Sequence, residues 1–180
     1  LLTVTTPHRG SPYADWCILN LGKRLGGLKL MKLLGLDVQA ISDLTTGSCR
    51  AFNRSIKNVP GVMYFSVSAA RPWHRVPPFA VHSQRLIHAA EGENDSLVSV
   101  RSSTWGEHLG VWPADHFHCV NHRFTIEIKE KTGDITPFYL KAVDRILDSD
   151  SEFRALWVNA VIGTLPLPRT FRNTTQRAVS

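Results

Sequence analysis

The chain has 180 residues, of which 43% are hydrophobic, and a formal net charge of +6. This length and hydrophobic content suit a single domain with a buried core. No run of about eighteen apolar residues occurs, so we expect no transmembrane helix. Lysine and arginine are scattered and no basic helix face is evident, which argues against a nucleic-acid partner.

The first half of the sequence predicts one strand and several helical segments. Residues 1–6 are apolar and β-branched, which is typical of a strand. They lack the basic leader and small-residue cleavage site of a secretion signal, so we expect the sequence to begin inside a domain. A helix is predicted over 12–20, with Ser11 as its cap. A leucine- and glycine-rich stretch at 21–36 precedes a further predicted helix at 45–56.

The second half alternates short strands with loops and ends in a helix. Strands are predicted at 62–67 and 97–100, separated by a proline-rich loop. Thr136-Pro137 opens the last clear helix. Residues 149–180 are predicted to be a partly disordered C-terminal extension. Strands that alternate with helices indicate an α/β fold, with a mostly parallel sheet covered by helices on both faces.

An aspartate and a histidine stand on two successive loops. Asp95 lies in a turn before the strand predicted at 97–100, and His116 lies on a later loop. An acid followed by a histidine, each on a loop after a strand, is the order of the last two members of a Ser-Asp-His triad. From spacing alone, an ordinary turn aspartate and a surface histidine explain the two residues better. No Gly-x-Ser-x-Gly turn, which would carry the serine, occurs in the 180 residues.

Four segments in order carry a resemblance to a known family. Their sequences are Thr-Pro-His-Arg-Gly-Ser-Pro-Tyr-Ala-Asp-Trp at 6–16, Asp-Leu-Thr-Thr with Ala-Phe-Asn within 43–53, Asn-Asp-Ser-Leu-Val-Ser-Val with Trp-Gly-Glu within 94–107, and Asp-His-Phe-His-Cys-Val-Asn at 115–121. Together they resemble the microbial triacylglycerol lipases and their fungal relatives in the α/β-hydrolase superfamily. The resemblance covers residues 1–148 and implies the C-terminal portion of an α/β-hydrolase domain, without the nucleophile elbow.

The resemblance implies an activity and two site residues. Asp95 corresponds to the acid of the triad and His116 to the general base. The complete enzyme is expected to hydrolyse carboxylic esters, especially lipid acyl esters, without a cofactor. The serine and the oxyanion-hole donors are expected upstream, so this chain alone should be inactive. His118 occupies the position of an aspartate in calcium-dependent bacterial members, which argues against a calcium site here.

Two other functions stay open at this point. The chain can be a truncated hydrolase that acts as a non-catalytic binding or structural module. It can also be a zinc hydrolase, because His116, His118 and His122 are spaced as metal ligands can be, with Asp115 adjacent. No second group of ligands with metal-like spacing is evident, so no metal is expected. A true start codon near Leu1, or metal in the purified protein, would favour these readings.

The leucine-rich stretch and the cysteines bear on contact with a lipid interface and on the cellular compartment. Residues 21–44 are either a lid that exposes leucines to a lipid interface or a buried helix–loop–helix, and the pattern fits both. The three cysteines, Cys17, Cys49 and Cys119, show no disulfide or zinc spacing. We therefore expect an intracellular protein, with peripheral association with membranes or lipid droplets as a further option.

Overall fold

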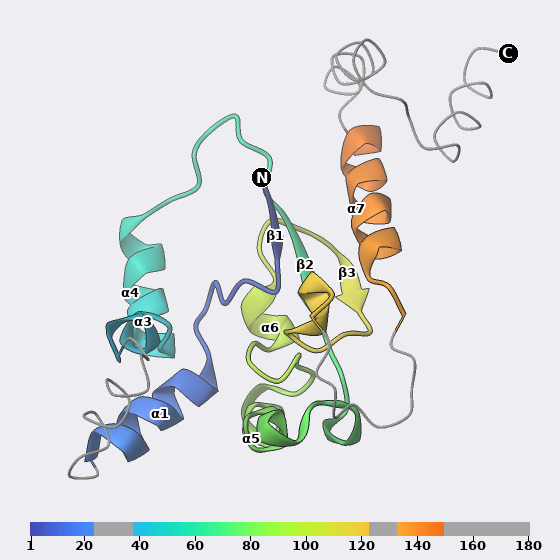
Figure 1. Ribbon diagram of the computed structural model, residues 1–180. Helices are drawn as coiled ribbons and strands as arrows, with labels where there is room; N and C mark the ends of the chain where they lie inside the picture. The colour runs from blue at the N-terminus through green and yellow to red at the C-terminus, as the bar shows by residue number, and fades with distance from the viewer. Residues whose placement is uncertain (24–37, 123–132, 150–180) are drawn as a thin grey trace, which may run out of the picture. The chain divides into compact units, whose positions relative to one another are not determined.

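The computed structural model describes residues 1–23, 38–122 and 133–149 (Figure 1). The chain divides into two compact units, Leu1–Phe138 and Tyr139–Ser180. Everything that bears on the predicted acid and base lies in the first unit. In the second unit, the described residues form the later part of a helix, in which Ala142 and Leu147 are buried. The predicted boundary at residue 148 stays a prediction.

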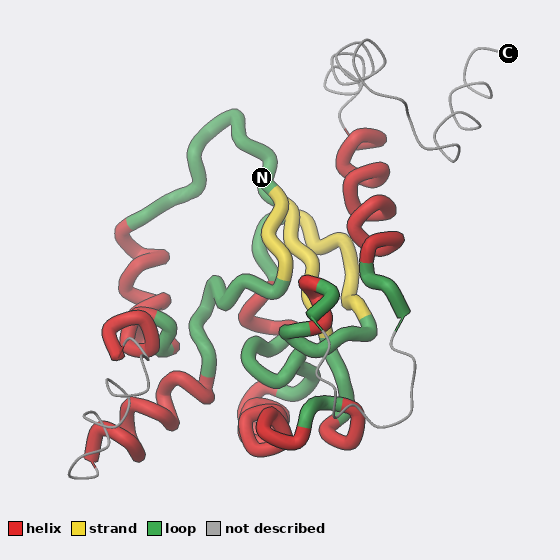
Figure 2. The backbone as a smooth tube through the Cα atoms, in the orientation of Figure 1, coloured by secondary structure: helices red, strands yellow, loops and turns green. Residues whose placement is uncertain are grey.

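A parallel sheet forms the centre of the first unit. Its strands are β1 (Leu2–Val4), β2 (Phe65–Ala69) and β3 (Glu107–Trp112), in the order β1-β2-β3 (yellow in Figure 2). Both strand pairs are parallel. The central strand β2 is buried along its whole length, as expected for a strand with neighbours on both sides. The predicted mostly parallel sheet is thereby confirmed in the part of the chain that the structure describes.

The strand predictions differ from the structure in detail. The strand predicted at 62–67 begins only at Phe65 and continues to Ala69, because Val62 lies in a turn in which its N–H bonds to Val59. The strand predicted at 97–100 is wrong. Ser99 instead caps a short helix, and its hydroxyl accepts the N–H of Ser102. Strand β3 was not predicted; its residues include a glycine and a histidine, and a tryptophan-proline step ends it, which weakens the strand pattern.

Helices connect these strands. Their bounds are α1 (Pro12–Lys23), α3 (Val38–Asp43), α4 (Thr46–Ser55), α5 (Val81–Glu91), α6 (Val100–Ser103) and α7 (Thr136–Ser149), with single 3₁₀ turns at Trp73–Arg75, Pro78–Ala80 and His118–Val120. The helices predicted at 12–20, 45–56 and from Thr136 are confirmed. Helix α5 was missed, because the preceding prolines and an even mix of polar and apolar residues concealed it.

Helix α4 is fixed at its N-terminus by two polar side chains. Thr45 is its cap, and its hydroxyl accepts the N–H of Ser48. Asp15 of α1 accepts the backbone N–H of Thr46 at 2.9 Å and the Thr46 hydroxyl at 2.7 Å. A carboxylate at this helix end satisfies otherwise unpaired N–H groups. The residues that resemble the lipase segments at 6–16 and 43–53 therefore contact each other.

One glycine is required where β2 and β3 begin. Gly106 has a φ of +61°, and a Cβ atom there would stand 2.1 Å from the carbonyl oxygen of Tyr64. The next residue, Glu107, donates its N–H to the same carbonyl at 2.8 Å. Glycine thus permits the close backbone approach that aligns the two strands.

The segment predicted as a lid falls mostly outside the described residues. Residues 24–37, which include the leucines that a lid would expose, are not described. The described end of the segment forms α3. Residues 150–180, the predicted extension, also lie outside. Among the helices that the structure does describe, none has the length and apolar character needed to cross a membrane.

Candidate active site

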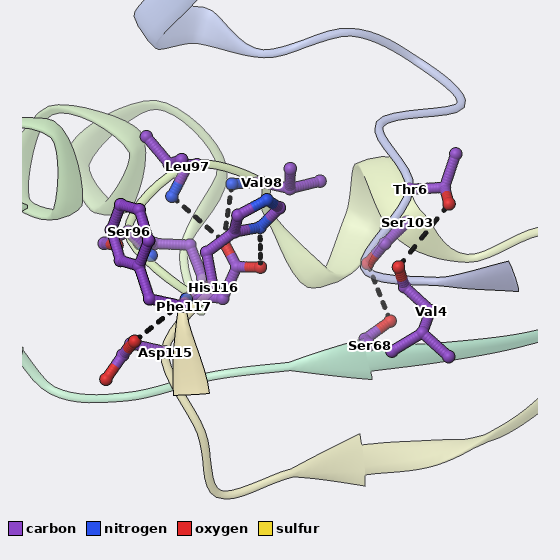
Figure 3. A network of polar contacts seen from close by, with 12 residues as sticks. Val4, Thr6, Ser68, Ser96, Leu97, Val98, Ser103, Asp115, His116 and Phe117 are labelled. Atoms are coloured by element: carbon purple, nitrogen blue, oxygen red, sulfur yellow. Dashed lines mark hydrogen bonds and ion pairs between the residues drawn. The ribbon is translucent and has the colours of Figure 1, made fainter. Parts of the chain in front are cut away.

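The loop that carries Asp95 is organised by the aspartate itself. The Asp95 side chain is fully buried. Its Oδ1 atom accepts the backbone N–H groups of Leu97 at 2.9 Å and Val98 at 2.7 Å (Figure 3). Its own N–H donates to the carbonyl of Val98. This turn is why the apolar residues after Asp95 do not form a strand: a short carboxylate offers the backbone a local alternative to a sheet.

The loop that carries His116 follows β3 and has the same construction. Asp115 is fully buried, and its Oδ1 accepts the N–H groups of Phe117 and His118, each at 3.0 Å. The backbone N–H of His116 donates to the carbonyl of Asp95 at 2.8 Å. The two loops are therefore joined through their backbones as well as their side chains.

The structure brings the predicted acid and base together. Nδ1 of His116 lies 2.8 Å from Oδ2 of Asp95. The Asp95 side chain is inaccessible to solvent, whereas the His116 side chain is 34% exposed. Since Nδ1 faces the carboxylate, Nε2 is the ring nitrogen available to a substrate or nucleophile. The contact is an observation; the catalytic roles of both residues stay a prediction.

The surroundings of His116 act on its pKa in opposite directions. Burial lowers the pKa of the imidazole, but the hydrogen bond with Asp95 and the negative charges of Asp95 and Asp115 raise it by more. The net result is a pKa above the usual histidine value. A carboxylate that holds one nitrogen of an imidazole favours its protonated form and also fixes its tautomer and orientation.

A buried ion pair next to the histidine escaped the sequence analysis. Nη1 of Arg71 lies 2.7 Å from Oδ2 of Asp115, and the two side chains are 9% and 1% exposed. Arg71 follows β2 after a single intervening residue. An arginine directly after a buried apolar strand was the available signal, because loops at the carboxyl ends of parallel strands collect functional groups. Nothing in the local pattern identified its partner.

The other histidines do not gather around His116. His118 is buried, and its Nε2 lies 2.7 Å from the carbonyl oxygen of Gly133, while its Nδ1 has no partner. Over residues 1–23, 38–122 and 133–149, no three His, Cys, Asp or Glu side chains are arranged to hold a metal ion. The geometry of the described residues thus gives the zinc alternative no support. The three cysteines are free thiols, and burial raises the pKa of Cys119 to about 12.

A second serine–histidine contact lies inside the sheet. Oγ of Ser68 on β2 is 2.9 Å from Nε2 of His108 on β3, and Ser103 donates to the same serine oxygen at 2.8 Å. Ser68 is fully buried. An ester carbonyl cannot reach a hydroxyl in this position, so we assign the contact to cross-strand packing.

Comparisons with known proteins agree with this architecture. No protein-family model matches the chain. Over 160 residues it is 33% identical to triacylglycerol lipase 2 of Saccharomyces cerevisiae, an alignment that covers 80% of this chain and 47% of the yeast protein. Among solved structures, the mature Bacillus licheniformis lipase BlEst2 shares 25% identity at a TM-score of 0.49, covering 64% of this chain and 46% of that one. The metagenomic carboxyl esterase MGS0156 shares 19% identity at a TM-score of 0.53, covering 76% of this chain and 40% of the esterase.

The parallel sheet with its connecting helices is that of a partial α/β-hydrolase fold, as the sequence predicts. In sequence it is similar to a fungal triacylglycerol lipase, which confirms the resemblance seen in its motifs. The chain spans about half the length of that lipase.

Proposed function

We propose that this chain supplies the acid and the general base of a lipase-type serine ester hydrolase. One observation carries the proposal: the buried Asp95 carboxylate holds Nδ1 of the partly exposed His116 at 2.8 Å. This leaves Nε2 as the ring nitrogen available to a serine hydroxyl. The sequence similarity to triacylglycerol lipase 2 supports a lipid acyl ester as the substrate class.

The pair can perform general acid–base catalysis at a serine. Nε2 of His116 would take the proton of the serine hydroxyl as its oxygen attacks the ester carbonyl, and would then return that proton to the departing alcohol. Water would release the acyl group from the serine by the same proton transfers in reverse. Asp95 would remain ionised and stabilise the imidazolium at each step.

On this proposal, the remaining parts of such a site come from sequence outside these 180 residues. No Gly-x-Ser-x-Gly turn is present in the chain. This motif would supply the nucleophile and one backbone donor of the oxyanion hole, and the second donor comes from an earlier strand–helix loop. We therefore propose that the chain alone does not turn over esters and that it acts when joined to a segment carrying these groups.

Ester turnover by two proteins tests the proposal. The first is the 180-residue chain, and the second, called the longer gene product below, is the product of its gene with any in-frame upstream sequence included. We expect p-nitrophenyl ester and triacylglycerol hydrolysis only from the longer protein, and only if that upstream sequence contains Gly-x-Ser-x-Gly after a strand. Robust hydrolysis by the 180 residues alone, abolished by His116→Ala, would contradict the proposal that the nucleophile lies outside this chain.

A further inference from the structure

Arg71 contacts both loops of the candidate site. Its guanidinium forms the 2.7 Å ion pair with Asp115, which precedes His116. Its backbone N–H donates to the carbonyl of Asn94 at 2.9 Å, which precedes Asp95. One residue thus binds the neighbour of the acid through its main chain and the neighbour of the base through its side chain.

The main chain of Arg71 is itself held by a buried amide network. Nε2 of Gln84 on α5 donates to the carbonyl of Arg71 at 3.1 Å. Nδ2 of Asn94 donates to the carbonyl of Gln84, also at 3.1 Å. Gln84 is 4% exposed and Asn94 is 1% exposed, so water does not compete for these bonds. Arg71, α5 and the Asp95 loop therefore form one rigid support.

The Arg71 guanidinium connects this support to the His116 loop through Asp115. Oδ1 of Asp115 accepts the two N–H groups directly after His116, and Oδ2 is bound by Arg71. Both oxygens of the carboxylate are therefore engaged, and its rotation would move the backbone that carries the imidazole. The arginine also offsets the negative charge of Asp115, which would otherwise lie uncompensated beside His116.

From these contacts we propose that Arg71 is the positioning residue of the site: it locks the Asp95 loop to the His116 loop so that carboxylate and imidazole meet. The inference rests on the proposed function for its catalytic meaning, but the locking itself is a property of the chain as it stands. Arg71 does not touch the pair, and it acts through Asp115 and Asn94.

Amide hydrogen exchange of the 180-residue chain tests the locking without any enzyme assay. In Arg71→Met, the His116 N–H that donates to Asp95 should exchange about tenfold faster or more, as expected when a hydrogen bond to a charged group is lost. Arg71→Lys retains the charge and should restore part of the protection. Arg101→Met removes an exposed arginine of α6 and is the control.

Each outcome of this experiment decides the proposal. If the His116 amide of a folded Arg71→Met chain exchanges at the rate of the control, the proposal is overturned. Should Arg71→Met fail to fold, Arg71→Lys decides, since it shortens the reach to Asp115 and loses the planar head. Its His116 amide should exchange faster than in Arg101→Lys, and equal rates would overturn the proposal.

Ester kinetics of the longer gene product separate a positioning role of Arg71 from a role in general stability. In Arg71→Met we expect kcat for p-nitrophenyl esters to fall about 100-fold with KM unchanged, because the imidazole is misplaced rather than the substrate. Partial recovery in Arg71→Lys is expected. If the longer gene product hydrolyses no ester at all, the proposed function fails, while the exchange experiment still tests whether Arg71 holds the two loops together. If wild-type protein is active and Arg71→Met has the same kcat, the positioning role fails alone.

Discussion

The two loops of the candidate site are built in the same way and end in different partners. In each, a buried aspartate accepts the backbone N–H groups two and three residues ahead of it through Oδ1. The second oxygen of Asp95 meets a histidine, whereas that of Asp115 meets an arginine. The histidine is partly exposed and changes its charge near neutral pH; the arginine is buried and always charged.

Under the proposed function, this difference separates a chemical role from a supporting one. The same turn geometry serves both carboxylates, so the turn itself does not indicate function. The residue that contacts Oδ2 distinguishes the two roles. A carboxylate that faces a titratable, solvent-reaching ring can assist proton transfer, while one that faces a permanent cation can only hold the backbone in place.

The largest effect should come from removing the base. In the longer gene product, His116→Ala is expected to lower ester turnover by about 10⁴-fold or more, because no other group would take the serine proton. His118→Ala is the matched control, since His118 faces the carbonyl of Gly133 instead of Asp95. Equal losses from both substitutions, in proteins of comparable stability, would remove the distinction between these two neighbouring histidines.

The next largest effect concerns the supporting carboxylate. Asp115→Ala leaves the buried Arg71 guanidinium unpaired, and we expect the free energy of unfolding to fall by about 3–5 kcal/mol. Urea denaturation of the 180-residue chain measures this. Asp43→Ala, at an exposed residue of α3, should cost less than about 1 kcal/mol. If Asp115→Ala lowers the free energy of unfolding no more than Asp43→Ala does, the ion pair does not stabilise the His116 loop.

A smaller effect is expected at two residues with positive φ. Ser96 beside the acid has a φ of 83°, and its buried Oγ has no partner. Ser96→Gly should therefore stabilise the chain by about 1 kcal/mol. Asn121 after the histidine loop has a φ of 56°, but its Oδ1 accepts the N–H of Ile135. Asn121→Gly should thus stabilise the chain less than Ser96→Gly, or destabilise it. Thermal denaturation that ranks the two variants in the reverse order would contradict this account.

The smallest effect is a pH dependence of stability. The pKa of His116 is raised in the folded chain. Protonated His116 therefore stabilises the folded chain fully below the unfolded histidine pKa of about 6.5, and this stabilisation is lost as pH rises through the higher folded value. We expect the free energy of unfolding to decline over this range, and to decline less in His116→Gln. Urea titrations at a series of pH values measure the difference. A wild-type curve that rises over the same interval, relative to the variant, would have the wrong sign.

Much of the fold could be predicted from the sequence, for physical reasons that apply to particular elements. The helices that begin at Pro12, Thr46 and Thr136 carry caps or prolines, which are local signals. Helix α5 and strand β3 lack such signals: α5 packs against α1, and β3 is held by its pairing with β2. The strand expected at 97–100 was wrong because Asp95 and Ser99 satisfy the local N–H groups with their side chains.

Only those residues of the candidate site that belong to a recognisable motif could be predicted from the sequence. Asp95 and His116 were identified from their order and from a family resemblance, and the structure adds their contact. The contacts of Arg71 could not be identified, because its partners Asn94 and Asp115 lie more than twenty residues away in sequence. Parallel strands with long connections bring such residues together, and the sequence pattern does not record these distant pairings.

The most direct test makes the same chemical change at both aspartates. Asp95→Asn and Asp115→Asn each keep an oxygen to accept the two backbone N–H groups and each lose one charge. In the longer gene product we expect Asp95→Asn to lower kcat by about 10⁴-fold, because the amide would favour the wrong tautomer of His116. Asp115→Asn should lower it by no more than about 100-fold. Equal losses, or a larger loss at Asp115, would contradict the assignment of Asp95 as the partner of the catalytic base.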